Sequence, residues 1–341
     1  MRTDTAYALA IFGLEFGLVP SGRLMVACGA GVGLTCSSLW TAQGVYCKEQ
    51  ALAYDRALGG SVKGGSLGHF NGFAYSGVQF GMLLAMLGSS VIMQVLGPRR
   101  RLIFGLLAAV AALGNGILFV LPTPATSPEV RTSAETKPPV SIAAVPKLIL
   151  KSSSMRLLFL SYLACGYSTS FASGTFTTDA AASSLGAAWL GYVVAFMKIF
   201  ATVSSRVLGK LSDSVGRFPV FMSSLALEMI PPLFLSLRGV TAGGNQKGLI
   251  FLLAACMGTG MTGSKLMVNT VVGDIFDMED TTTALSCANI ATSITAGSAF
   301  LIGPNASLRT KSNLFATLGA ISLLGMASMI PLLRKAREAK K

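Results

Sequence analysis

The segment GKLSDSVGR, residues 209–217, lies between two apolar stretches of the sequence, 185–208 and 218–237. Each stretch has the roughly 20 mostly apolar residues that an α-helix needs to cross a lipid bilayer. The segment between them is short and polar, and it contains two glycines. It therefore predicts a tight connection between two membrane-spanning helices, and it places the protein among α-helical membrane proteins.

The residue types in this segment suit a helix connection at the membrane edge. Gly209 has no side chain to hold a neighbouring helix away, and Gly216 can adopt the positive φ of a sharp turn. The carboxylate of Asp213 can cap the N-terminus of the following helix or pair with a basic side chain. Arg217 can tie the segment to a neighbouring helix. These residues are therefore candidates for holding helices together at one face of the membrane.

The composition of the 341 residues also indicates a membrane protein. Hydrophobic residues make up 52% of the chain and charged residues only 12%, whereas a soluble domain has roughly 25% charged residues. The net charge of +13 is explained by the Lys and Arg that gather in cytoplasmic loops of membrane proteins. We therefore expect the lipid bilayer as the environment of the chain and no nucleic-acid partner.

Ten stretches of the sequence are apolar and long enough to be candidates for membrane-spanning helices. The first is short and ends at Pro20, so a signal peptide is an alternative, but it starts with Asp4 and lacks a basic cluster. We expect a helix there. The ten stretches are 5–20, 24–46, 69–96, 102–121, 156–176, 185–208, 218–237, 248–272, 284–304 and 312–333.

A polar stretch with six prolines, 122–155, separates the first four of these helices from the last six. Proline and charge at this density are incompatible with a membrane-spanning helix and favour a linker. The sequence therefore predicts three parts. Residues 1–121 form an incomplete N-terminal helix bundle, 122–155 a cytoplasmic linker, and 156–341 a C-terminal six-helix bundle with a basic tail.

The distribution of Lys and Arg predicts the orientation of the chain. With the C-terminus in the cytoplasm, most of the 27 basic residues lie on the inner side, including those of the linker and of the loop 48–63. The triplet Arg99–Arg101 falls outside, and its role is not explained by this orientation. The sequon at Asn305 also falls outside, where glycosylation is expected.

The segment 209–217 resembles G-x-L-[SA]-D-[RK]-x-G-[RK]-[RK], the signature of the major facilitator superfamily. Ser214 and Phe218 replace two positions that are usually basic. The resemblance implies an all-α major facilitator fold and a transmembrane transporter. It assigns the role of a gating motif to Gly209, Asp213, Gly216 and Arg217.

A second segment, GLTCSSLWTAQGVY at residues 33–46, is similar to the fourth-helix signature of the Unc-ninety-three-like family, a branch of this superfamily. Weaker similarities to other helices of that family occur at 68–73, 170–177 and 189–193. Some members regulate potassium channels, and others escort membrane receptors. The resemblance therefore implies a transmembrane transporter of unknown solute or, alternatively, an accessory protein that regulates an ion channel or escorts another membrane protein.

The same resemblance aligns the start of this chain with the third of twelve family helices. We therefore expect about ten transmembrane helices, with the first two of the family missing. Alternating access rocks two halves against each other around a site near the middle of the membrane. A half without two of its helices would lack a wall, so we expect that this chain alone does not transport.

Polar side chains recur on single faces of several predicted helices. Asn71, Tyr75 and Gln79 are four residues apart, which places them on one face. Polar residues inside a membrane mark substrate pathways, although Ser, Thr and Asn also pack helices together. The candidate cavity residues are Trp40, Gln43, Asn71, Tyr75, Gln79, Lys198, Lys265 and Asn269.

Lys265 is the most informative of these residues, because a lysine in the middle of a membrane span is costly unless it is paired or hydrated. We expect its side chain to face the protein interior. Its acceptor there is Glu15, Glu228, a hydroxyl, a helix C-terminus, water or an anionic ligand. Small and polar residues share its helix face, namely Gly258, Thr262 and Asn269. The opposite face is predicted to contact lipid through Leu253, Met257 and Met267.

The remaining polar features indicate no catalytic chemistry. The acidic run from Asp274 to Asp280 lacks the spacing of a calcium loop and is predicted to be a solvated cytoplasmic loop. His69 is the only histidine, and the six cysteines form no C-x-x-C pair. We therefore expect no enzyme activity, no cofactor and no metal site.

Overall fold

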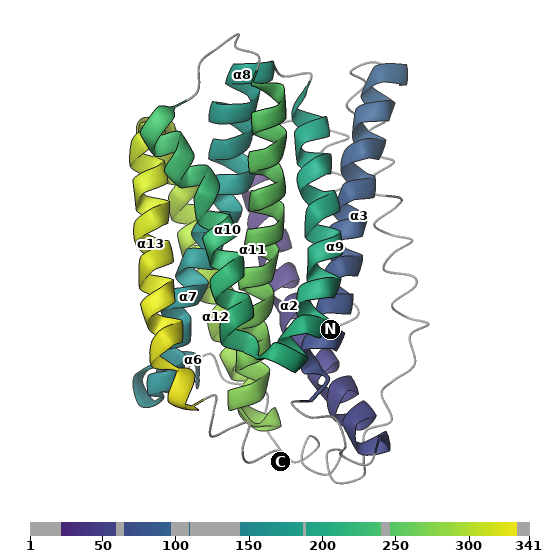
Figure 1. The fold of residues 1–341 in the computed structure, drawn as a ribbon, viewed down its shortest axis with the longest axis vertical. Coiled ribbons are helices and arrows are strands. Elements are labelled where there is room, and N and C mark those ends of the chain that lie inside the picture. The colour runs from purple at the N-terminus through teal and green to yellow at the C-terminus, as the bar shows by residue number, and fades with distance from the viewer. Residues whose placement is uncertain are drawn as a thin grey trace.

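The structure, a computed structural model, describes residues 22–58, 65–96, 109, 144–186, 189–239 and 246–332. These residues form helices, and no strand is found among them (Figure 1). The elements are α2 (Gly22–Ala57), α3 (Leu67–Leu96), α6 (Ala144–Lys151), α7 (Ser153–Ser170), the π-helix η1 (Phe171–Ala182), α8 (Ser183–Leu185), α9 (Leu190–Val215), α10 (Arg217–Arg238), α11 (Lys247–Ile275), α12 (Met278–Ile302), the 3-10 helix η3 (Gly303–Asn305) and α13 (Leu308–Ser328). The predicted spans 5–20 and 102–121, Arg99–Arg101 and the C-terminal tail lie outside the described residues.

Five helices in the described part of the chain are long and apolar enough to cross a bilayer. A sixth span results if Ala144–Lys151 and Ser153–Leu185, which meet at an angle of 108°, are counted together. Helices suit this environment because each one satisfies its own backbone hydrogen bonds in lipid. The predicted all-α membrane fold is therefore confirmed. The five spans are Leu190–Val215, Arg217–Arg238, Lys247–Ile275, Asp280–Ile302 and Leu308–Leu332.

Helix α11 occupies the centre of the arrangement (Figure 1). It packs against α9 and α10 over much of its length, and it also contacts α3, α7 and α12. Around it, α7 packs between α12 and α13, and α10 packs against α13. Of the N-terminal helices that the structure describes, α3 packs along α9 and α2 packs against α12.

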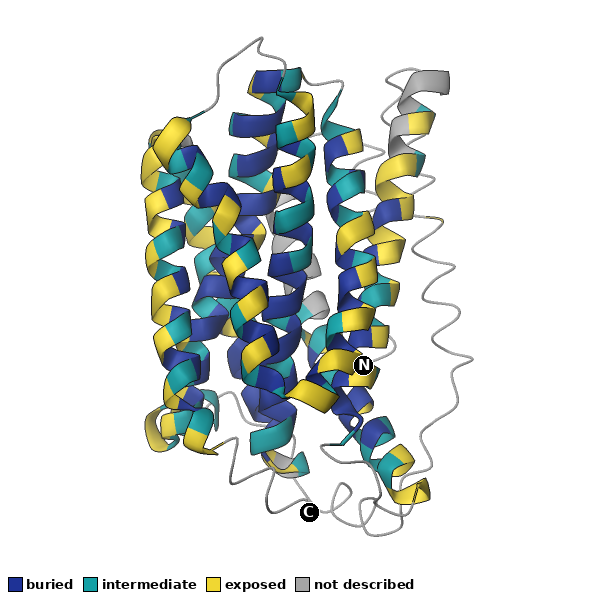
Figure 2. Ribbon diagram, in the orientation of Figure 1, coloured by how far each residue is buried: buried dark blue, intermediate teal, exposed yellow. Residues whose placement is uncertain are grey.

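The burial of α11 corrects one prediction from the sequence. Leu253, Met257 and Met267 were expected to face lipid, but their exposed fractions are 2%, 0% and 0%. Within its membrane span, 67% of α11 is buried, against 22–44% for the other four spans. Figure 2 shows more dark blue along α11 than along α13. A helix surrounded by neighbours buries large and small residues alike, so residue size did not reveal which face of α11 meets lipid.

Part of the predicted linker is also helical. Residues 144–151 form α6, which packs against α12 and α7 through Val145, Leu148 and Ile149. Pro146 lies in the first turn of α6, where a missing N–H breaks no helical hydrogen bond. Ser152 then starts α7, because its side chain accepts a hydrogen bond of 3.2 Å from the amide of Met155.

Candidate functional site

A polar cavity lies where α2, α3, α7, α11 and α12 meet. Its volume is about 30 Å³, which is room for about two water molecules. Six of the eight predicted cavity residues line it, namely Trp40, Gln43, Asn71, Tyr75, Lys265 and Asn269. Lys48, Tyr162 and Asn289 also line it, whereas Gln79 and Lys198 lie outside its lining.

The side chain of Asn269 connects three helices within this cavity. Its amide nitrogen donates a hydrogen bond to the hydroxyl of Tyr75 on α3. Its amide oxygen accepts a hydrogen bond of 2.5 Å from the hydroxyl of Tyr162 on α7. The ring of Trp40 on α2 stacks on Tyr75 with a centroid separation of 6.2 Å. Both hydrogen-bonding ends of the Asn269 amide are thus engaged by protein.

Lys265 points into the cavity from α11. Its Nζ lies 5.6 Å from the centroid of the Trp40 ring, within the range of a cation–π contact. Among the described residues, Lys265 has no hydrogen bond and no ion pair. The cavity that its ammonium enters is lined by aromatic and amide side chains, including Trp40, Tyr75 and Asn269.

Glu228, one of the two acidic partners considered for Lys265, is bound elsewhere. Its side chain is buried and accepts hydrogen bonds from the hydroxyls of Ser168 and Ser264, the latter at 2.5 Å. No ion pair joins Glu228 to Lys265 in the described residues. The prediction of that pair is wrong, because both carboxylate oxygens are held by hydroxyl groups. The other candidate, Glu15, lies outside the described residues.

The two predicted residues outside the cavity form a bridge between α3 and α9. Nζ of Lys198 donates a hydrogen bond of 2.9 Å to Oε1 of Gln79. One helical face of α3 therefore carries three interhelical contacts, because Asn71 and Tyr75 on that face bond to Thr270 at 3.3 Å and to Asn269. These contacts join α3 to α9 through Gln79 and to α11 through Asn71 and Tyr75.

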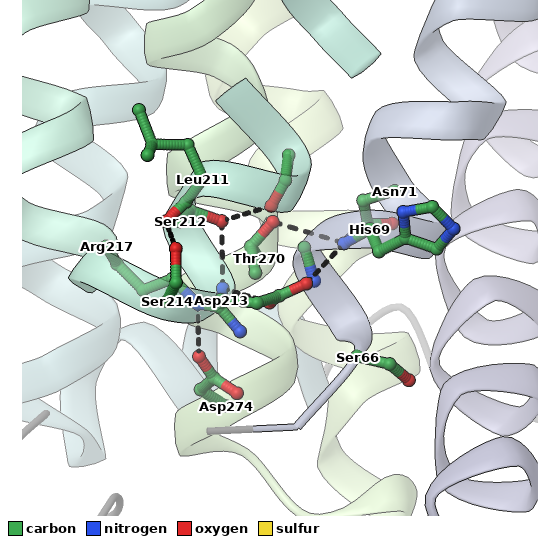
Figure 3. Close-up of polar contacts among 12 residues, drawn as sticks. Ser66, His69, Asn71, Leu211, Ser212, Asp213, Ser214, Arg217, Thr270 and Asp274 are labelled. Atoms are coloured by element: carbon green, nitrogen blue, oxygen red, sulfur yellow. Dashed lines mark hydrogen bonds and ion pairs between the residues drawn. The ribbon is translucent and has the colours of Figure 1, made fainter. Parts of the chain in front are cut away.

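Residues 209–215 form the last turns of α9 and Arg217 begins α10, so the segment is not the connecting loop expected from the sequence. Gly216 alone interrupts the helices, with a φ of 110°. Asp213 caps α3, whereas the sequence suggested a cap for the following helix α10. Its two carboxylate oxygens accept hydrogen bonds from the amides of Gly68, at 2.9 Å, and His69, at 2.7 Å (Figure 3). This difference arises because the N-terminus of α3 lies beside the end of α9.

Arg217 is buried at this end of the bundle and is held by two carboxylates. It pairs with Asp213, and its Nε lies 2.9 Å from Oδ2 of Asp274 on α11 (Figure 3). Asp274 was predicted to lie in a solvated loop, but it belongs to α11, and only 12% of its side chain is exposed. The pair ties the α9–α10 junction to α11. We call this end of the bundle, which contains Asp213, Arg217 and Asp274, the motif end.

Glycines allow α3 and α9 to meet closely at the motif end. A Cβ atom on Gly209 would lie 2.4 Å from the carbonyl oxygen of Gly68 and 2.8 Å from Cα of Gly72. Both of these atoms belong to the backbone and cannot rotate away. The close approach of the two helices therefore depends on glycine at position 209.

Lys48 forms a second contact at the motif end. The sequence placed it in a loop, but α2 continues to Ala57, and Lys48 is 6% exposed. Its Nζ donates hydrogen bonds to the carbonyl oxygen of Phe276 and, at 2.7 Å, to Oγ1 of Thr281. Because Phe276 directly follows α11, the ammonium caps the negative end of that helix.

A comparison of the sequence with known families identifies the group to which this arrangement belongs. A profile described as Major Facilitator Superfamily matches residues 5–300. The chain belongs to the major facilitator superfamily. It is an integral, multi-pass membrane protein with the all-α fold predicted from the sequence.

A solved structure agrees with this assignment to the major facilitator superfamily. The crystal structure of the E. coli fucose:proton symporter matches with a TM-score of 0.64 and 14% sequence identity, and the alignment covers 95% of this chain and 81% of that chain. At this identity the similarity concerns the fold alone. A search of curated proteins found no match.

Three polar residues of this major facilitator chain were missed as site residues by sequence reasoning. Lys48, Asp274 and Thr281 lie near predicted helix ends, where charged and hydroxyl side chains usually face water. Their contacts with other helices show that they hold helices together at the motif end. The exposed Asn305 lies in η3 between α12 and α13, and its glycosylation stays a prediction.

Proposed function

We propose that this protein is a solute carrier that binds a small solute in the cavity at Lys265 and releases it by alternating access. The observation that carries the proposal is a lysine inside a membrane-embedded polar cavity, with no hydrogen bond or ion pair from the described residues. An intramembrane charge of this kind is costly, so its presence favours a functional role.

The contacts at the motif end support a closed gate on that side of the cavity. Lys48 joins α2 to α11 and α12, and Asp213 joins α9 to α3, so both contacts cross between the parts 1–121 and 156–341. Arg217 holds the α9–α10 junction to α11 within the second part and so positions Asp213. The cavity holds about two water molecules, so a solute must enter while the helices are farther apart. We propose that the parts 1–121 and 156–341 move relative to each other, with 122–155 as the linker.

We place the motif end and the C-terminus in the cytoplasm. The basis is the distribution of Lys and Arg, which gather in the loops and the linker on that side. Under this orientation the contacts of Asp213, Arg217 and Lys48 form the cytoplasmic gate, and a solute enters from the opposite side.

A second candidate is an accessory protein that regulates an ion channel or escorts another membrane protein. The similarity of residues 33–46 to the Unc-ninety-three-like signature supports it. The small volume of the cavity, about 30 Å³, also favours it, because a protein that only holds a partner needs no room for a solute.

Uptake by the purified full chain in liposomes separates these candidates. Radiolabelled sugars, amino acids and carboxylates are assayed one by one. The carrier proposal predicts saturable uptake of at least one solute, and Lys265→Met should reduce that uptake while the melting temperature stays close to that of the parent chain. Lack of saturable uptake by the folded protein would contradict the carrier proposal.

A further inference from the structure

We infer that the cavity at Lys265 binds a small organic anion, with the ammonium of Lys265 and the amide of Gln43 as the donors for its carboxylate. This inference rests on the proposed function, because it names the class of solute that the same cavity takes.

The charge of the cavity wall favours an anion. The described residues that line it include two lysines, Lys48 and Lys265, and none of these lining residues is acidic. Lys48 is already engaged, since it caps the end of α11 and bonds to Thr281. Within the described part of the chain, the interaction partner of the Lys265 ammonium is the face of the Trp40 ring, which compensates a desolvated ammonium in part. A negatively charged ligand would complete that compensation.

The amide of Gln43 is the second donor available to such a ligand. Among the residues that the structure describes, its nitrogen has a single hydrogen-bond contact, of 4.0 Å, with the thiol of Cys47, and sulfur is a weak acceptor. By contrast, the nitrogen and the oxygen of the Asn269 amide each already bond to a tyrosine hydroxyl. An ammonium and an amide N–H from facing helices can each bind one oxygen of a carboxylate.

The size of the cavity fits the polar end of such a ligand. About 30 Å³ accommodates about two water molecules, and a carboxylate group brings two oxygens into the same space. The stacked rings of Trp40 and Tyr75 offer an apolar wall for a short carbon chain. The geometry therefore points to a short-chain carboxylate, whose carbon chain enters when the helices separate.

Trp40 provides a direct reporter of binding that does not depend on transport. The chain contains two tryptophans, Trp40 and Trp189, so Trp189→Phe leaves Trp40 as the single one. An anion on Lys265 draws the ammonium away from the Trp40 ring and changes its fluorescence. The experiment titrates the purified full chain carrying Trp189→Phe with butyrate, butyramide and butylammonium at constant ionic strength.

We expect a saturable change in Trp40 fluorescence with butyrate, together with a higher melting temperature, and no change with butyramide or butylammonium. Lys265→Gln should weaken butyrate binding by about tenfold or more, the usual effect of losing a charge-assisted hydrogen bond. Lys265→Arg, which keeps the charge, should retain the response. Lys247→Gln is the matched control, because Lys247 belongs to the same helix but is exposed and does not line the cavity.

Three results would overturn the inference. An equal response to butyramide would show that the charge of the ligand plays no role. An unchanged response in Lys265→Gln would show that Lys265 does not bind the ligand. No response to butyrate in the folded parent chain would exclude a short-chain carboxylate as the ligand. Each of these leaves the carrier proposal standing if a neutral or cationic solute is taken up. Conversely, butyrate binding without any uptake would support the anion site and contradict the carrier proposal.

Discussion

The carboxylate of Asp213 caps helix α3 through the backbone amide of His69, at a distance of 2.7 Å, although the two residues are 144 positions apart in the chain. The same carboxylate pairs with Arg217, which in turn binds Asp274 on α11. One side chain thus satisfies the free N–H groups at a helix start and neutralises a buried guanidinium. The end of α9 therefore clamps α3 and α11 together at the motif end.

The first prediction separates the cap from the ion pair at Asp213. Asp213→Ala removes both, whereas Asp213→Asn removes the charge but keeps an oxygen for the amides of Gly68 and His69. Asparagine caps a helix about as well as aspartate, and alanine costs about 0.5–2 kcal/mol. We expect a lower melting temperature for both variants and a larger drop for Asp213→Ala, measured on the purified protein in detergent.

Asp277→Asn serves as the control for this comparison. Asp277 is exposed at the N-cap of α12, and its side chain makes no capping hydrogen bond. Its substitution should leave the melting temperature within the error of the parent chain. Equal destabilisation by Asp213→Ala and Asp213→Asn would show that the cap on α3 adds nothing to the ion pair.

The second prediction concerns the glycine contact between α3 and α9. In Gly209→Ala the new Cβ atom would lie 2.4 Å from the carbonyl oxygen of Gly68, so the two helices must separate. We expect a lower melting temperature and a smaller yield of folded protein on size-exclusion chromatography. Gly81→Ala on α3 is the matched control, since nothing lies within 4 Å of its added Cβ atom. That change should be neutral or stabilising by up to about 1 kcal/mol. Equal loss in both variants would contradict the role of the contact.

Much of this fold could be predicted from sequence because the bilayer imposes a simple rule. About 20 apolar residues in a row form a membrane helix. Every predicted span within the described residues, from 24–46 to 312–333, corresponds to a helix of the structure. Helix ends were less predictable. The motif residues 209–215 continue α9, and α2 extends to Ala57, since charged residues at a membrane surface can continue a helix as readily as end it.

The candidate site was predictable where it depends on spacing along one helix, and not where it depends on contacts between helices. Asn71, Tyr75 and Gln79 follow from a four-residue repeat, and all three are buried against neighbouring helices. The pairing of Arg217 with Asp274 joins positions 57 apart, and the contact of Lys48 with Phe276 joins positions 228 apart. No local pattern reveals which partner such a charge finds.

The third prediction tests whether the hydrogen bonds of Lys48 hold the motif end closed, a role that we call the latch. Lys48→Met keeps the length of the side chain but cannot donate to the carbonyl of Phe276 or to Thr281. We expect the motif end to open more often. Cys47, which is 5% exposed, should then react about fivefold faster with N-ethylmaleimide, the factor that corresponds to about 1 kcal/mol. The measurement uses a chain in which Cys47 is the single cysteine.

The control for the latch uses a cysteine that lies in the core. Cys287 on α12 has an exposed fraction of 0%. In a chain that carries Cys287 as its single cysteine, Lys48→Met should leave the labelling rate unchanged. Faster labelling of both cysteines would indicate general destabilisation, and unchanged labelling of Cys47 would contradict the latch.

The fourth prediction concerns the bridge between Lys198 and Gln79, which joins α9 to α3 through a hydrogen bond of 2.9 Å. Gln79→Leu leaves the ammonium of Lys198 without this acceptor in a largely apolar setting. A buried polar group that loses its partner costs about 1–3 kcal/mol, while replacing both partners by apolar side chains is nearly neutral. The double variant Gln79→Leu/Lys198→Met should therefore melt at a higher temperature than Gln79→Leu alone. This order, measured in one double-mutant cycle, identifies a direct interaction. Additive losses in the two single variants would instead mean that Lys198 and Gln79 stabilise the helices independently, and that α3 is held to α9 by the glycine contact and the Asp213 cap.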